Sequence, residues 1–124
     1  TYVPELPANT RGQSNFGGTV FIDAEQGYGA LRALDIHTGN LEWEFTYPSP
    51  TFGGVMSTAS GLVFAGDHEG NFMAFSAATG ENLWHYQTGT RIWGAAAITY
   101  MLDGLQYVLI PSGTTLTAFA TRMP

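Results

Sequence analysis

The chain has 124 residues, of which 44% are hydrophobic and 11% are charged, so it has enough apolar content for a core and disorder is a poor first expectation. Ten acidic residues against four basic ones give a formal net charge of -6, which argues against binding to a nucleic-acid backbone, because that binding requires clustered cations. No stretch reaches the roughly 20 apolar residues of a membrane span, and there is no Cys for a disulfide or a thiolate metal site.

The first 18 residues carry no motif. Pro4, Pro7 and Asn9-Thr10 favour an extended, loosely held arm over residues 1–18. The opening residues also lack the basic and apolar regions of a secretory signal peptide. We therefore expect the folded part to occupy residues 19–124.

An internal repeat organises that folded part. The segment Ala33–Trp43 returns 41 residues later as Ala74–Trp84, with Ala, Thr-Gly and Trp at equivalent positions. A third, partial copy follows at Thr114–Ala120. A period near 40 residues is typical of the four-stranded blades of a β-propeller.

Short runs of β-forming residues alternate with turns rich in Gly, Asp and Thr, and no segment has a helical period. These runs predict ten strands, in chain order Thr19–Ile22, Leu31–Asp35, Leu41–Thr46, Val55–Ser57, Leu62–Ala65, Phe72–Ser76, Leu83–Gln87, Ala96–Tyr100, Tyr107–Ile110 and Leu116–Ala120.

The strands group into blades of unequal completeness. The middle repeat holds four strands, whereas residues 19–46 supply about three strands and residues 95–120 supply three without an outer fourth. We therefore predict an all-β, partial β-propeller with one complete four-stranded blade flanked by two incomplete blades, at about residues 19–47, 48–88 and 89–120. Leu116–Ala120 would be an unpaired sheet edge, which natural proteins usually cover.

The repeated pattern Ala-x-Asp-x-x-Thr-Gly-x-x-x-Trp resembles the tryptophan-docking motif of quinoprotein dehydrogenases. The resemblance implies that Asp and Gly build the turn before the outer strand and that Trp packs on the neighbouring blade. Ser76 stands in the Asp position of the second copy, where its hydroxyl is a weaker acceptor. The docking residues are Ala33, Asp35, Gly39, Trp43, Ala74, Gly80 and Trp84.

Other stretches are similar to the C-terminal end of pyrroloquinoline-quinone (PQQ)-dependent alcohol dehydrogenases: Gly53–Thr58, Gly61–Asp67 and Asp103–Val108. The resemblance covers residues 29–120 and implies a periplasmic enzyme that oxidises alcohols to aldehydes with PQQ and calcium. The family's catalytic Asp, calcium ligands and adjacent cysteines have no match in this chain. We therefore expect a fragment or truncated relative that is inactive alone and binds neither cofactor tightly.

Two loops are candidates for the cofactor side, because the resemblance implies that the loops from an outer strand to the next inner strand open toward the quinone. The candidate residues are Phe52 and Gly53 in the first loop and Arg91 and Trp93 in the second. Phe52 stands where the family often has a Trp. The alternative is that Phe52 and Trp93 pack against a blade and that Arg91 lies between blades.

Asp67-His68-Glu69 invites interpretation as a metal site, but consecutive residues on a short turn diverge and rarely supply three convergent ligands. We expect a solvated turn there and no metal site in the chain. His37, in a docking turn, and His85, on an outer strand, are expected to be structural or surface residues.

A rival interpretation is a non-enzymatic scaffold or binding module. In that case the partners would be further copies of the chain, in place of missing propeller blades, and a closed homo-oligomer would remove the exposed edges and explain the low surface charge. A sugar-binding propeller is a third possibility, supported only by the aromatic content.

Overall fold

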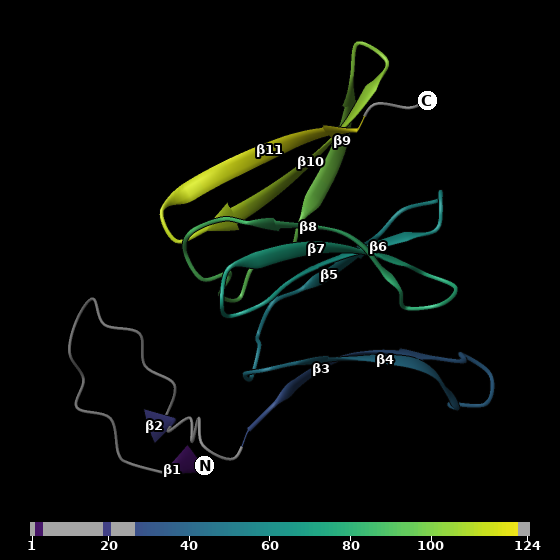
Figure 1. Ribbon diagram of the computed structural model, residues 1–124, viewed down its shortest axis with the longest axis vertical. Coiled ribbons are helices and arrows are strands. Elements are labelled where there is room, and N and C mark those ends of the chain that lie inside the picture. The colour runs from purple at the N-terminus through teal and green to yellow at the C-terminus, as the bar shows by residue number, and fades with distance from the viewer. Residues whose placement is uncertain (1, 4–18, 21–26, 122–124) are drawn as a thin grey trace.

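The computed structural model describes residues 2–3, 19–20 and 27–121, and every regular element among them is a β-strand (Figure 1). No helix in the described part of the chain is long and apolar enough to cross a membrane. The strands are β1 (Tyr2–Val3), β2 (Thr19–Val20), β3 (Gly29–Leu34), β4 (Leu41–Tyr47), β5 (Val55–Ser57), β6 (Leu62–Gly66), β7 (Asn71–Ser76), β8 (Asn82–Gln87), β9 (Ile98–Leu102), β10 (Leu105–Ser112) and β11 (Thr115–Thr121).

The central sheet is the complete blade predicted from the sequence. Its four strands pair antiparallel in chain order, β5-β6-β7-β8, with Phe64 opposite Ala74 and Ala74 opposite Trp84. On one side of it β3 pairs with β4, and on the other side β9, β10 and β11 form a sheet of three strands (Figure 1). The all-β, open partial propeller is therefore confirmed, including the last sheet without a fourth strand.

The first blade differs from the prediction. Residues 19–46 were expected to give about three strands of one blade, but β2 pairs with β1, with Tyr2 opposite Val20, and the β3–β4 sheet has two strands. The β propensity of Thr19–Ile22 predicts a strand but does not specify its partner. Residues 1, 4–18 and 21–26, which include most of the expected arm, lie outside the described part.

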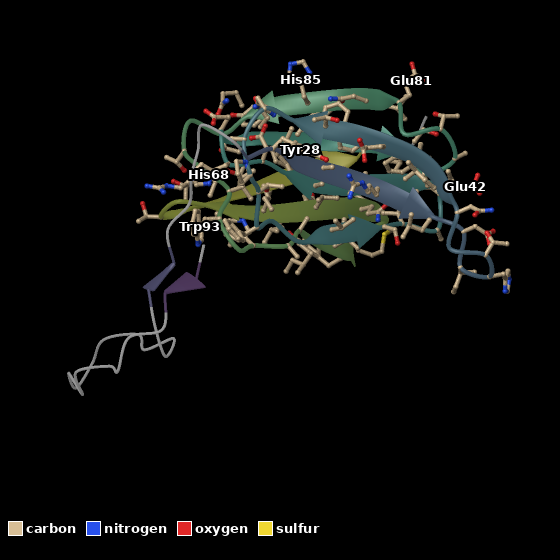
Figure 2. All side chains as sticks on the ribbon, turned by 90° about the horizontal axis from the view of Figure 1, so that it is seen from below. Tyr28, Glu42, His68, Glu81, His85 and Trp93 are labelled. Carbon is tan, nitrogen blue, oxygen red and sulfur yellow. The ribbon has the colours of Figure 1, made fainter. Side chains whose placement is uncertain are left out.

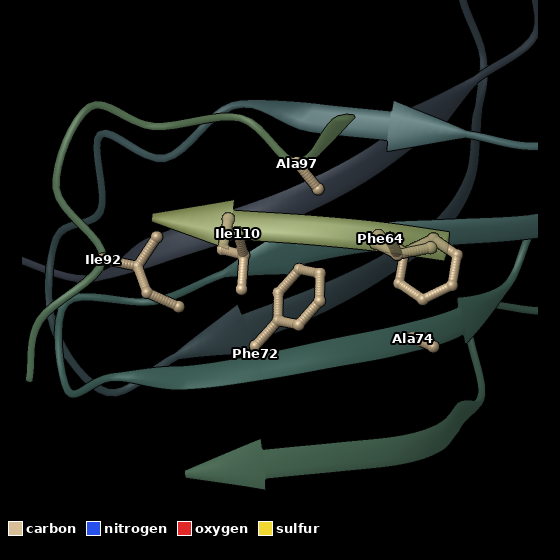
Figure 3. Close-up of a cluster of buried hydrophobic side chains, with 7 residues drawn as sticks. Phe64, Phe72, Ala74, Ile92, Ala97 and Ile110 are labelled. Carbon is tan, nitrogen blue, oxygen red and sulfur yellow. The ribbon is translucent and has the colours of Figure 1, made fainter. Parts of the chain in front are cut away.

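Strands β6 and β7 of the central sheet bury side chains on both faces of the sheet. Side chains alternate along a strand, so Phe72 and Ala74 of β7 face β9–β11, while Met73 and Phe75 face β3–β4. Figure 3 shows the first of these clusters, formed by Phe64, Phe72, Ala74, Ile92, Ala97, Val108 and Ile110. The second contains Leu31, Tyr47, Ala65, Met73 and Phe75. Full burial of Phe72 and Phe75 contributes about 1.5–3 kcal/mol each.

The repeated motif builds the same turn twice. The amide of Asp35 donates to the carbonyl oxygen of Asn40 at 2.8 Å, and the amide of Ser76 donates to that of Glu81 at 2.9 Å. Each turn contains a Gly with a φ of 72°, at Gly39 and Gly80. Each is followed by a shift in strand register.

The two turns differ at the position where Ser replaces Asp. The Asp35 carboxylate accepts hydrogen bonds from the Thr38 amide (2.7 Å), the Thr38 hydroxyl (2.9 Å) and the His37 amide (3.0 Å). These hydrogen bonds hold the pKa of Asp35 below its usual range. The Ser76 hydroxyl accepts one bond, from the Thr79 amide at 3.3 Å, which confirms the expected weaker acceptor.

The two motif tryptophans have different environments. The Trp43 indole N–H donates to the carbonyl oxygen of Ala77 in the neighbouring sheet at 2.9 Å, and a Cβ at Gly80 would lie 2.6 Å from the Trp43 ring. Trp84 meets Phe119 of β11 edge-on at 5.1 Å but remains 39% exposed. It borders an apolar cleft of about 380 Å³ between the central sheet and the β9–β11 sheet, lined also by Leu62, Phe64, Ala74, Val108, Phe119 and Ala120.

The contact between Trp43 and Gly80 predicts that Gly80→Ala destabilises the chain more than Gly39→Ala. Both glycines have a φ of 72°, so both variants carry the same left-handed strain of about 1–2 kcal/mol. Only at Gly80 would the new methyl group also displace the indole, since a Cβ at Gly39 has no atom within 4 Å. We expect chemical denaturation to give a further loss of about 1–3 kcal/mol for Gly80→Ala. Equal losses would contradict the packing argument.

Candidate functional site

Three connections meet at one end of the stacked sheets. They are the β4–β5 loop (48–54), the β6–β7 turn (67–70) and the β8–β9 loop (88–97). Because antiparallel strands reverse direction, connections two strands apart return to the same end. Figure 2 shows His68 and Trp93 together at this end, with Glu42 at the opposite one.

The two loops predicted to carry site residues contact each other through their aromatic rings. The ring centroids of Phe52 and Trp93 lie 5.0 Å apart at an interplanar angle of 43°. The guanidinium carbon of Arg91 lies 5.8 Å from the centroid of the Trp93 ring. Phe52 is 51% exposed and Trp93 is 50% exposed, so about half of each side chain stays accessible after this packing.

Gly53 has a different place. It is half-buried, and a Cβ there would lie 2.9 Å from the carbonyl oxygen of Gly66 at the end of β6. The Thr51 hydroxyl donates to the same Gly66 oxygen and accepts from the Gly53 amide, each at 3.3 Å. Gly53 therefore lets the loop pass close to β6.

A cleft of about 450 Å³ opens beside Trp93, lined by Arg91, Trp93, Ala95, Pro111 and Gly113. It lies between the β8–β9 loop and the end of the β10–β11 hairpin, which are joined by a hydrogen bond of 3.2 Å from the Gly113 amide to the Arg91 carbonyl oxygen. One cation, one indole and small apolar walls suit a planar ligand that carries negative charge.

The prediction of a solvated turn at Asp67-His68-Glu69 is wrong for Asp67. Its side chain is 3% exposed, and its two carboxylate oxygens accept hydrogen bonds from the Asn71 amide and the Asn71 side chain, both at 2.8 Å. The carboxylate folds back to close its own turn, a role that a run of three polar residues does not reveal. Glu69 is exposed and accepts from the Ser49 hydroxyl.

His68 is half-buried against Trp93, at 5.0 Å between ring centroids and 62° between planes. The sequence motifs did not predict that His68 lies beside the candidate loops. The signal that would have found it is strand direction, because the turn after a second strand returns to the same end as the loop after the fourth. His37 and His85 are exposed, as expected.

No group of three or more His, Asp and Glu side chains is arranged to hold a metal ion among the residues that the structure describes. The acidic residues at this end are used separately, Asp67 within its own turn and Glu69 toward the β4–β5 loop. We therefore assign no metal ligand.

Hydrogen bonds donated to carbonyl oxygens of the β6–β7 turn fix the β8–β9 loop and the end of β8. The amide of Ile92, whose side chain is fully buried, donates to the carbonyl oxygen of Asp67 at 3.2 Å. The Thr88 amide donates to the carbonyl oxygen of Gly70 at 2.9 Å, and the Gln87 side chain donates to that of Glu69 at 3.2 Å. The segment carrying Arg91 and Trp93 is thus attached by hydrogen bonds to the β6–β7 turn.

The chain is similar to known quinone-dependent enzymes. Residues 46–108 match the family model described as glucose/ethanol/alcohol dehydrogenase, beta-propeller domain, for PQQ enzymes. Quinoprotein alcohol dehydrogenase PedH of Pseudomonas putida is 42% identical over 85 residues, which are 68% of this chain and 14% of that protein. Quinohemoprotein alcohol dehydrogenase of Comamonas testosteroni is 37% identical over 111 residues, 86% of this chain and 16% of that one.

The crystal structure of quinohemoprotein alcohol dehydrogenase from Comamonas testosteroni superposes with a TM-score of 0.65 and 40% identity, over 69% of this chain and 13% of that one. A europium-containing methanol dehydrogenase superposes with a TM-score of 0.64 and 35% identity, over 68% of this chain and 15% of that one. The chain therefore spans about one seventh of the length of the relatives it matches.

Burial of Tyr47, the last residue of β4, predicts a loss of stability at high pH. Burial, with the nearby negative charge of Asp67, raises the pKa of Tyr47 to about 12, above the ordinary value near 10. The unfolded chain therefore loses this proton first, and the free energy of unfolding should fall by on the order of 2–3 kcal/mol between pH 10 and pH 12. Chemical denaturation at several pH values should show that Tyr47→Phe loses this pH dependence of the free energy of unfolding. The control Tyr86→Phe, at an exposed residue, should keep it. An unchanged slope in Tyr47→Phe would contradict the assignment.

Proposed function

The chain belongs to the family of PQQ-dependent glucose, ethanol and alcohol dehydrogenases, and from this membership we propose that it is a piece of a quinoprotein alcohol dehydrogenase. The whole enzyme would oxidise alcohols to aldehydes. The observation that carries the proposal is the contact between Phe52 and Trp93, from the loops of two successive sheets, beside the guanidinium of Arg91.

These residues fit one part of a quinone site. PQQ is planar and carries carboxylates, and when bound it supplies the acceptor for two electrons. Phe52 and Trp93 offer half-exposed rings to a planar group, and Arg91 offers a cation to a carboxylate. Gly53 keeps the Phe52 loop close to β6. We propose that these four residues form a share of the rim around the quinone.

We assign no catalytic residue. The resemblance to the family implies that the base that takes the substrate proton and the calcium ligands belong to blades other than these. This part of the enzyme would orient the cofactor and cover it from water, and the proton would move elsewhere. We therefore propose that the chain is inactive alone and does not bind PQQ or calcium tightly.

We also propose that the repeated motif locks neighbouring blades together. The support is the Trp43 indole, which bonds to Ala77 and covers Gly80 of the next sheet. Ala33 and Ala74 lie directly opposite Trp43 and Trp84 in their strand pairs, where a small side chain leaves room for each indole. Asp35 and Gly39 shape the turn that leads into Trp43. Periplasmic location is likewise a proposal, since it is carried only by the family resemblance.

One observation fits a self-associating scaffold as well as a longer enzyme. By strand alternation, the face of the β9–β11 sheet that points away from the central sheet carries only apolar and aromatic side chains at its paired positions. Five of them are between 39% and 63% exposed: Ile98, Tyr100, Leu102, Leu105 and Leu116. A face of this kind is covered either by the next blade of a longer protein or by a second copy of the chain.

The cofactor proposal predicts weak PQQ binding without turnover. PQQ added with calcium should shift the Trp93 indole resonance in NMR spectra in a saturable way, because the quinone would lie against that ring. The Trp84 indole, in a different cleft, is the internal control. Addition of an alcohol and an artificial electron acceptor should give no reduction of the acceptor. Reduction would overturn the proposed inactivity, and an unmoved Trp93 resonance would overturn the rim assignment.

The alternative predicts association through the β9–β11 face. Light scattering at several concentrations should then give a dimer or a larger closed assembly, and Leu116→Lys should shift the mass to that of a monomer. Leu34→Lys, at an apolar residue of β3 that is 60% exposed, is the matched control and should leave the mass unchanged. A monomer at every concentration would contradict self-association and leave the face to a further blade.

A further inference from the structure

His68 contacts the candidate rim from a turn that belongs to neither of its two loops. The centroid of the His68 imidazole lies 5.0 Å from the centroid of the Trp93 ring. The centroid of the Phe52 ring also lies 5.0 Å from that of Trp93. Trp93 therefore meets rings from two other connections, the β4–β5 loop and the β6–β7 turn. His68 belongs neither to the repeated docking motif nor to the residues that line the cleft beside Trp93.

We propose that His68 is a positioning residue that fixes the orientation of the Trp93 indole at the mouth of the cleft. The ligand side of this inference rests on the proposed function, in which a planar, negatively charged ring packs on Trp93. The orientation of the indole in the free chain does not depend on it.

The backbone holds His68 and Trp93 in a fixed relation. The amide of Ile92 donates to the carbonyl oxygen of Asp67 at 3.2 Å. His68 directly follows Asp67 in the chain, and Trp93 directly follows Ile92. The Ile92 side chain is fully buried, and the Asp67 carboxylate is closed by two bonds from Asn71. The main chain under both rings is therefore anchored, and their contact needs no rearrangement of either loop.

Contacts with neighbouring side chains restrict the Trp93 indole. It is 50% exposed and extends from a loop with no strand pairing, and its ring meets Phe52, His68 and Arg91. Phe52 is itself 51% exposed, and Arg91 is exposed with a long flexible side chain. The half-buried His68, on a turn closed by Asp67, is the most constrained of the three neighbours.

The inference predicts a selective loss of order at one of the three tryptophans. Nitrogen relaxation of the indole N–H groups should give a lower order parameter for Trp93 in His68→Ala, with Trp43 and Trp84 unchanged. His68→Phe, which keeps a ring at the contact, should restore the order. His85→Ala removes an exposed imidazole from β8 and is the matched control. An unchanged Trp93, or an equal fall at all three indoles, would overturn the positioning role.

PQQ titrated with calcium tests the ligand side. His68→Ala should raise the dissociation constant about two- to tenfold, the range that one aromatic pair supplies, and His68→Phe should return it toward the original value. Unchanged affinity in His68→Ala would overturn the effect on the ligand. If PQQ does not bind to the unaltered chain, the proposed cofactor rim fails, whereas the indole order parameters still decide whether His68 positions Trp93.

Discussion

The central sheet has two apolar faces, and the rest of the structure depends on covering both. Strand β7 places Phe72 on one side and Phe75 on the other, each fully buried, so neither face can be left to water without losing several kcal/mol. The β3–β4 sheet covers the Phe75 side through Leu31 and Tyr47, and the β9–β11 sheet covers the Phe72 side through Val108 and Ile110. Stacked sheets are the arrangement that meets this requirement.

The candidate site follows from the same stacking. Once three antiparallel sheets lie face to face, the connections after every second strand end side by side, and Phe52, His68 and Trp93 come from three such connections. Two of these ring residues directly follow a buried residue in the chain: Trp93 follows Ile92, and His68 follows Asp67. Burial in the core thus fixes the backbone positions from which the exposed rings extend.

Sequence reasoning predicted the features that depend on short-range patterns. Runs of β-forming residues located β2 to β11 to within about two residues at each end, whereas β1 was not predicted. The Asp35 and Ser76 turns follow from local side-chain chemistry. It failed where a partner is distant in the chain. A strand at Thr19–Val20 can pair with any free edge, so its pairing with β1 was not predicted. The burial of Asp67 was not predicted for the same reason. A run of three polar residues does not indicate which distant parts of the chain will cover it.

The two interfaces show why the docking motif has to be considered together with the sheet that receives it. Trp43 finds a carbonyl acceptor and a bare glycine surface in the turn of the central sheet, and its indole N–H is satisfied. Trp84 has the same position in its own strand pair, but across the interface it meets the ring of Phe119, and it stays 39% exposed beside an apolar cleft. The tryptophan alone therefore does not close an interface. The turn at Ala77–Gly80 of the central sheet supplies the other half of the contact that Trp43 makes.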